Sequence, residues 1–484
     1  MAKKGFVAFI LLSCFNLFSQ QLKISENRRY LEDSNGDPFL WIGDTAWELF
    51  HKLDREETDE YLTIRKSQGF SVIQAVLLAE LDGLRTPNAY GYLPLIDLDP
   101  AKPNEPYFQH VDYVIKKANN LGLVVGVLPT WGDKLYSLNP GEGPIVFNKE
   151  NAKEYGAYLG KRYRDKNIFW ILGGDRNIDS PEVLEIWRAM AAGLRSGDDG
   201  KHLITFHPRG ERSSSSMAHN EAWLDFNMYQ SGHVRRFNPV YKFAMTDYSK
   251  KPTKPFVEGE PAYEDIPVRF WEYIDFAGTK KVPDSVVDDS GLIKDTMYFR
   301  EGFFTDYDVR VHAYWNFLAG AAGFTYGNNA VWQMYKKGDP LIIPSLYDWR
   351  ASLDRPGARQ MIHLKRLLEI YQISVLVPDQ SIISGDNPEN EQHIRAAKSM
   401  DAEWALIYLA QGQKVNIVMD KMKSKRLTAY YYNPKSGTPV FIGNLKNNGI
   451  QEFYPPNQGL NNDWILVLDG KMDNYKKLSE SKSE

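Results

Sequence analysis

The most constraining feature of the chain is a series of short, nearly unbroken apolar runs that alternate with stretches of helical periodicity. Two clear runs are Leu123–Leu128 and Ile168–Leu172, which contain no charged residue. Strands that are buried on both faces have this composition, and they occur in parallel sheets covered by helices. Between the runs, apolar residues recur at spacings of three and four, as they do from Tyr107 to Leu121. The pattern predicts a repeating β/α architecture.

Roughly eight such units follow one another, which predicts an α/β fold of the (β/α)8 (TIM) barrel type. The predicted strands are Phe39–Gly43, Phe70–Leu78, Leu123–Leu128, Ile168–Leu172, Leu203–Phe206, Phe226–Tyr229, Pro255–Val257 and Gly323–Tyr326. A doubly wound open sheet is the alternative, but it usually carries a Gly-rich phosphate loop after the first strand. No such loop follows Gly43, so we expect a catalytic barrel over residues 21–375.

The sequence changes character after about Val377. Short predicted strands then alternate with turn-forming residues such as those of Asn433–Gly437. These strands are Trp404–Leu409, Val415–Met419, Leu427–Tyr432 and Trp464–Leu468. The pattern predicts a small antiparallel β-sandwich over residues 376–470. The Lys/Ser-rich residues 471–484 are expected to form a flexible tail.

The N-terminal residues have the pattern of a secretory signal peptide. Lys3 and Lys4 precede an apolar run, Phe6–Phe18, that is too short to span a bilayer. We expect residues 1–20 to be removed, which predicts a secreted, periplasmic or cell-surface protein without an integral membrane segment. Cys14, the only cysteine, weakly resembles a lipoprotein attachment site, but the apolar run continues beyond it, so simple cleavage near Gln20 is favoured. The mature chain would then lack thiols, which excludes disulfides and cysteine catalysis.

Composition narrows the classes of partner. The formal net charge of −4 gives no reason to expect nucleic acid. The nine His residues are scattered without zinc-motif spacing, so neither a metal nor another cofactor is expected. Aromatic residues make up 13% of the chain, including 12 Trp and 28 Tyr. They either fill a large core or provide flat surfaces for sugar rings.

The carboxyl ends of barrel strands and the loops after them form the active face of a TIM barrel. Carboxylates, amides, His and Trp gather at these positions, where purely solvated loops would carry more Lys and Ser. This predicts a site for a poly- or oligosaccharide. The candidate substrate-binding residues are Asp44, Trp47, Trp131, Asp133, Arg176, His207, Gln230, His233, Tyr263, Tyr326 and Trp332. Structural roles remain the alternative for Asp44 and Asp133, and either histidine could instead satisfy a loop carbonyl.

Two acids follow the fourth and seventh predicted strands, Asp175 and Glu260. Glycoside hydrolysis uses two carboxyl groups, which retaining enzymes hold about 5–5.5 Å apart as nucleophile and acid/base. Asp175 could alternatively cap a helix, and Glu260 could form a structural ion pair. Glu258 competes with Glu260, because two residues on one strand share a face. A retaining glycosidase with Asp175 and Glu260 as catalytic residues is the interpretation we favour.

Taken together, the strand-end motifs resemble those of glycoside hydrolase family 140. The matching stretches are Trp41–Trp47, Pro129–Lys134, Gly173–Asn177, Thr205–Pro208 and Gly259–Glu264. The resemblance covers about Leu22–Tyr371 and continues into the C-terminal part, which resembles a module named for collagen binding. We interpret that module as structural support for the barrel.

The resemblance implies a catalytic barrel that acts on apiose linkages in the pectin rhamnogalacturonan II. It also implies Asp175 as acid/base and Glu260 as nucleophile, and it favours Glu260 over Glu258. Two other hypotheses remain: a glycosidase with another, furanosidase-like specificity, and a non-catalytic carbohydrate-binding protein. Acids at both expected strand ends argue against the second, because a binding protein needs no such pair.

Overall fold

The structure is a computed structural model, which describes residues 21–80, 82–138, 143–276, 278–340 and 342–480 of the 484. The predicted signal peptide, with Cys14, lies outside these residues. In the described part of the chain, no helix combines the length and the apolar composition needed to cross a membrane.

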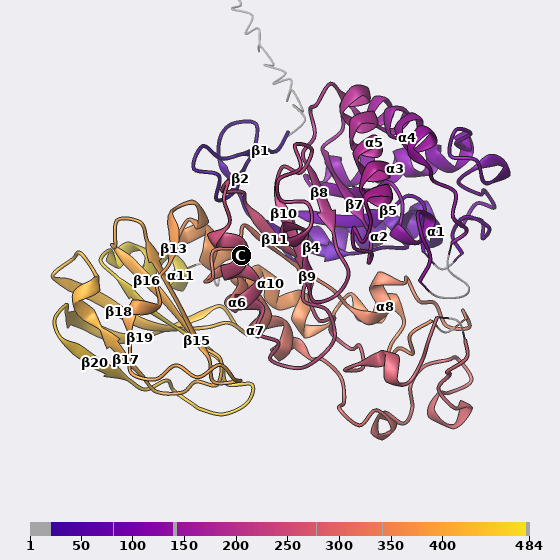
Figure 1. Cartoon of the computed structure of the whole chain (residues 1–484). Coiled ribbons are helices and arrows are strands. Elements are labelled where there is room, and N and C mark those ends of the chain that lie inside the picture. Colours follow the sequence, from indigo (N-terminus) through magenta and orange to yellow (C-terminus); the bar gives the residue numbers. More distant parts are fainter. Residues whose placement is uncertain (1–20, 81, 139–142, 277, 341, 481–484) are drawn as a thin grey trace, which may run out of the picture.

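Parallel strands form the predicted TIM barrel (Figure 1). They are β4 (Trp41–Thr45), β5 (Val72–Val76), β6 (Val124–Leu128), β7 (Ile168–Gly173), β8 (Ile204–His207), β10 (Asn227–Gln230), β11 (Phe256–Glu260) and β12 (Gly323–Tyr326). The ladders run in the order β8-β7-β6-β5-β4-β12-β11-β10, and β9 (Arg212–Ser213) pairs antiparallel with β10. The circle closes between β8 and β10, where the Thr205 hydroxyl donates to the Phe226 carbonyl at 2.7 Å. The fold prediction is confirmed.

The strands are buried on both faces, which explains their unbroken apolar sequences. Inside the barrel, Trp41, Phe169 and Val257 belong to one buried cluster, whereas the outward-facing Ile73 and Trp170 pack in a second cluster with the helices. Leu31 joins the inner cluster from a small antiparallel sheet before the barrel. That sheet comprises β1 (Lys23–Ile24), β2 (Leu31–Glu32) and β3 (Pro38–Phe39).

Helices cover the outside of the barrel. Several begin at a capping box, such as the pair of Asp54 and Glu57 that opens α2. The long helices are α2 (Arg55–Ser67), α3 (Glu105–Asn120), α4 (Lys149–Tyr163), α5 (Pro181–Asp198), α6 (Val240–Ser249), α7 (Asp306–Phe317) and α10 (Pro356–Ile370), and the short ones are α1 (Leu49–Lys52), α8 (Asn329–Trp332) and α9 (Trp349–Ser352). Helix α6 was not predicted from the sequence.

The C-terminal part consists of two antiparallel sheets that face each other as a sandwich. The larger sheet has the order β13-β15-β16-β21-β18-β19 and the smaller one β14-β17-β20. Their strands are β13 (Leu376–Pro378), β14 (Ile383–Ser384), β15 (Ile394–Ser399), β16 (Trp404–Leu409), β17 (Val415–Val418), β18 (Arg426–Asn433), β19 (Thr438–Lys446), β20 (Ile450–Phe453) and β21 (Trp464–Asp469). Ile407 from the larger sheet and Ile417 from the smaller one share a buried cluster. Part of the expected flexible tail is instead helix α11 (Met472–Glu480), in which Leu478 is fully buried.

Candidate active site

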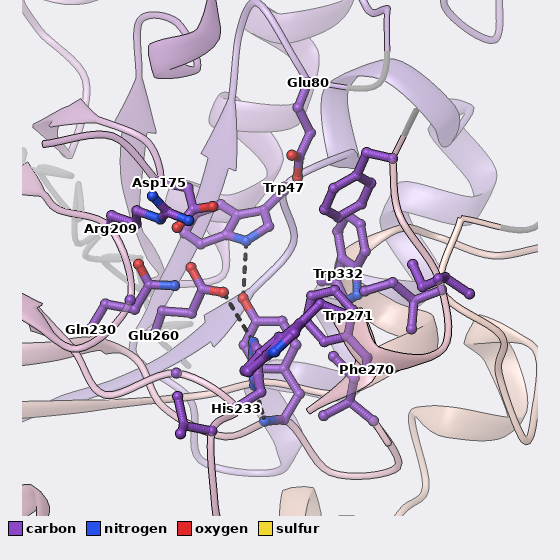
Figure 2. A pocket seen from close by; sticks show the side chains of 18 of the residues that line it. Trp47, Glu80, Asp175, Arg209, Gln230, His233, Glu260, Phe270, Trp271 and Trp332 are labelled. Carbon is purple, nitrogen blue, oxygen red and sulfur yellow. Dashed lines mark hydrogen bonds and ion pairs between the residues drawn. The ribbon is translucent and has the colours of Figure 1, made fainter. Parts of the chain in front are cut away.

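A cavity of about 740 Å³ opens at the carboxyl ends of the barrel strands, and Figure 2 shows it from close by. Both predicted catalytic residues and seven of the predicted substrate-binding residues line it. These are Asp175, Glu260, Trp47, Trp131, Arg176, Gln230, His233, Tyr263 and Trp332. Residues that are far apart in the sequence therefore meet where the strands end, as expected for a TIM barrel.

Asp175 reaches the cavity through a turn that only glycine allows. At the end of β7, Gly173 and Gly174 have φ values of +90° and +102°, and Asp175 itself lies in the left-handed region at +51°. A Cβ on Gly173 would come 2.2 Å from the His207 carbonyl oxygen, and one on Gly174 would press against the Trp131 ring. Such strained backbone gathers at functional sites, because surrounding packing must enforce it. Here it turns the chain so that Asp175 lines the cavity.

Glu260, the last residue of β11, lies between two histidines. His207 Nε2 is 3.1 Å from Glu260 Oε2, and His233 Nε2 is 3.4 Å from Glu260 Oε1. The other ring nitrogen of each histidine faces a backbone N–H: that of Asp175 for His207 and that of Tyr263 for His233, both at 3.4 Å. Because each Nδ1 accepts, the ring proton belongs on Nε2, the nitrogen that lies beside the carboxylate.

A hydroxyl group completes the surroundings of Glu260. The Tyr263 oxygen accepts a hydrogen bond of 3.0 Å from Trp47 Nε1, which leaves its own proton available. Burial raises the pKa of Tyr263 well above its ordinary value, and the Glu260 charge raises it further, so the phenol stays protonated. Tyr263 therefore presents a neutral O–H group beside the carboxylate.

The two carboxyl groups have opposite pKa shifts. Burial raises the pKa of Asp175 to about 6, and the negative charge of Glu260 adds to the effect. Burial alone would also raise the pKa of Glu260, but the contacts with His207 and His233 outweigh it and lower the pKa to about 2. Glu260 is thus ionised in a range where Asp175 still carries a proton, the division of roles that acid/base chemistry requires.

Glu258 is separated from this chemistry. It is fully buried, and its carboxylate accepts hydrogen bonds from the hydroxyls of Ser231 and Tyr229. Burial raises its pKa to about 8, and it does not line the cavity. In the pairing of β10 with β11, Tyr229 lies opposite Glu258. The register then shifts, so that Gln230 lies opposite Glu260 and Gly259 is passed over. Of the two competing glutamates, the structure brings Glu260 alone to the cavity.

Four predicted substrate-binding residues do not line the cavity. Asp44 is fully buried and binds Arg65 at 2.6 Å, so its structural alternative holds. Asp133 pairs with the neighbouring Lys134 and accepts from the Gly143 N–H. The other two are Tyr326, whose hydroxyl donates to Glu264, and His207, which acts on Glu260 from behind the cavity wall. All four side chains are buried and contact other protein groups, which strand-end position alone does not reveal.

Other cavity residues were missed in the sequence. Glu80 lies four residues beyond β5, Arg209 two residues beyond β8, and Trp271 in the long segment between β11 and α7. The signal for Glu80 was an acid directly after the apolar run that ends at Ala79, and for Trp271 a pair of aromatic residues inside a loop. Among the described residues, no group of three or more His, Cys, Asp or Glu side chains is placed to hold a metal ion.

Comparisons with known proteins identify the family of the chain. The profile of a family described as "Apiosidase-like, catalytic domain" matches residues 25–374. The chain belongs to the apiosidase-like family. A second profile, described as "Putative collagen-binding domain of a collagenase", matches residues 377–469, the C-terminal sandwich of this apiosidase-like protein.

Two solved structures resemble nearly the whole apiosidase-like chain. One, titled "Glycoside hydrolase", has a TM-score of 0.81 and 31% identity, and the match covers 94% of this chain and 98% of the other. The second, a family 5 glycoside hydrolase from Bacteroides vulgatus ATCC 8482, has a TM-score of 0.79 and 31% identity over 93% of this chain and 94% of the other. A search of curated proteins found no match. The apiosidase-like protein is therefore a glycoside hydrolase with a carbohydrate substrate.

Proposed function

We propose that the protein is a retaining glycosidase that removes apiosyl residues from pectin of the rhamnogalacturonan II type. The opposite pKa shifts of Asp175 and Glu260 in one cavity carry the mechanistic part of this proposal. The family and the strand-end motifs support the choice of sugar. As sequence analysis indicated, we further propose that the chain is exported.

In the first step, a Glu260 oxygen attacks the anomeric carbon while Asp175 gives its proton to the departing glycosidic oxygen. The bond to the leaving group breaks and a bond from sugar to Glu260 forms. The N–H groups of His207 and His233 keep Glu260 ionised before attack, and the raised pKa of Asp175 keeps it protonated.

In the second step, the now anionic Asp175 takes a proton from water, whose oxygen attacks the same carbon and releases Glu260. Two displacements restore the original anomeric configuration. Gln230 suits sugar binding during both steps, because its side-chain oxygen is buried without a hydrogen-bond partner at the wall of the cavity. A hydroxyl of the substrate can supply that partner.

The decisive experiment has two stages. Purified protein is first screened on rhamnogalacturonan II and on a panel of oligosaccharides that includes other furanosides, to identify the sugar released. Proton NMR then follows the first-formed anomer of the product. We expect apiose with retained configuration; release of another sugar would reject the apiosyl specificity, and an inverted product would reject the mechanism.

A further inference from the structure

A third carboxyl group shares the cavity with Asp175 and Glu260. Figure 2 shows the side chain of Glu80 reaching into the cavity toward Trp47. No residue that the structure describes forms a hydrogen bond or an ion pair with its carboxyl group. By contrast, Asp133 has a lysine partner and Glu258 has two hydroxyl donors. Nothing in the described protein therefore uses the hydrogen-bonding capacity of Glu80.

The surroundings of Glu80 oppose a negative charge. Burial raises its pKa well above the ordinary value, and the charges of Glu48, Asp175, Asp133 and Glu260 raise it further. These acids lie on different elements: Glu48 follows β4, Asp133 is in the loop after β6, Asp175 lies two residues beyond β7, and Glu260 ends β11. A carboxyl group in such a place remains protonated unless a cation joins it.

A protonated carboxyl group has one O–H donor and one carbonyl acceptor. A sugar hydroxyl also donates and accepts, so the two groups can pair without placing another negative charge beside the catalytic carboxyls. We propose that Glu80 is a substrate-binding residue that holds a hydroxyl of the reacting sugar while in its neutral, protonated form. This inference rests on the proposed function, because it takes the cavity to hold the sugar whose bond is cleaved.

The test compares Glu80→Gln with Glu80→Ala on a substrate that the wild-type protein hydrolyses. Gln keeps the length, a donor and an acceptor and cannot ionise, so kcat/KM should stay within about threefold of wild type. Ala removes both contacts, and kcat/KM should fall about tenfold. Glu154→Gln, on the exposed side of α4, is the control. Wild-type activity in the Ala variant overturns the inference, and so does a Gln variant as slow as the Ala variant.

Substrates that each lack one hydroxyl of the reacting sugar locate the contact. For one of these substrates, kcat/KM of the wild-type protein should be about tenfold lower than for the complete substrate. Glu80→Ala should not lower kcat/KM further on that substrate, because the hydroxyl that Glu80 would bind is already absent. If the effects of Glu80→Ala and of the missing hydroxyl on kcat/KM multiply independently for every such substrate, the proposed contact is overturned.

Difference infrared spectroscopy between wild type and Glu80→Gln at neutral pH reports the protonation state without any substrate. The C=O band of a protonated carboxyl group should disappear in the variant. Loss of a carboxylate band instead would show that Glu80 is ionised and would overturn the proposal that it acts in its neutral form. Failure of the proposed function gives a different result, namely an inverted product, another released sugar, or turnover in a Glu260→Gln protein. Those outcomes leave the ratio between the two Glu80 variants unchanged.

Discussion

The cavity and the cluster around Arg310, at the interface between barrel and sandwich, treat buried polar groups in opposite ways. At the interface, Arg310 of α7 is fully buried and uses all five N–H donors. Its partners are Asp306, Gln360, Asn461 and Asp463. In the cavity, Glu80 has no described partner and Gln230 keeps an unpaired oxygen.

This difference separates stability from chemistry. The bonds of Arg310 pair its donors with acceptors from both domains, and the interface continues an apolar cluster in which Leu364 of α10 and Trp404 of β16 both take part. The cavity buries Asp175, whose pKa is raised by that burial and by the charge of Glu260, and it holds Asp175 at a positive φ; both arrangements cost folding free energy. Substitutions at the interface should therefore change the free energy of unfolding, whereas substitutions in the cavity should change the kinetics of hydrolysis.

The largest effect is expected from the catalytic pair. Asp175→Asn should lower kcat by about 10²–10⁴-fold, the usual contribution of a general acid/base. Glu260→Gln should lower it further, because no covalent intermediate can then form. Steady-state kinetics on the identified substrate measure both, with circular dichroism as the control for folding. Turnover near the wild-type rate in either variant would remove that residue from the mechanism.

Arg310→Ala should act on stability alone. Removing the arginine leaves the carboxylate of Asp463 buried without its charge partner, which costs about 3–5 kcal/mol of unfolding free energy. None of the partners of Arg310 lines the cavity, so kcat/KM at 25 °C should remain unchanged. Urea denaturation and kinetics on the same preparation separate the two effects.

Arg359→Ala is the matched control for this prediction. Arg359 of α10 also pairs with an aspartate, Asp354, but the two side chains are 55% and 74% exposed, so the cost should stay below about 1 kcal/mol. Equal losses from the two arginines would show that the interface is no more important to stability than a surface ion pair.

A smaller effect is expected on the pH profile. His233→Phe keeps a ring beside Tyr263 but removes one of the two N–H groups that lower the pKa of Glu260. Glu260 must be ionised to attack, so the acid limb of kcat/KM, near pH 2 in wild type, should move to higher pH. The alkaline limb, set by the protonated form of Asp175 near pH 6, should move less. An acid limb that stays in place would mean that His233 does not stabilise the carboxylate.

The sequence predicts the barrel well because each strand carries its own signal. The barrel strands are buried on both faces, so most of their residues are apolar regardless of which neighbours they pair with. The catalytic pair could be found for a related reason, since strand ends lie at one face of any TIM barrel. Asp44 also lies at a strand end, but its partner Arg65 is on a helix 21 residues away, and no local pattern records that pairing.

The wall of the cavity is less predictable, because it depends on how loops fold over the strand ends. Glu80 and Trp271 lie in such loops, and neither position has a periodicity that indicates where the side chain points. The histidine contacts with Glu260 join three different strands or the loops after them. They arise from tertiary structure alone.

The smallest effect is expected at this wall. Trp271 is 40% exposed and lines the cavity beside Phe270, whereas Trp47, which also lines it, is only 2% exposed. An exposed indole can stack on a sugar ring of the leaving group, so Trp271→Ala should raise KM by about tenfold or less and leave kcat unchanged. Trp271→Phe, which keeps a flat ring, should lose less. A small aryl glycoside of the same sugar should show no change with either variant; a fall in kcat on that substrate would place Trp271 with the reacting sugar instead.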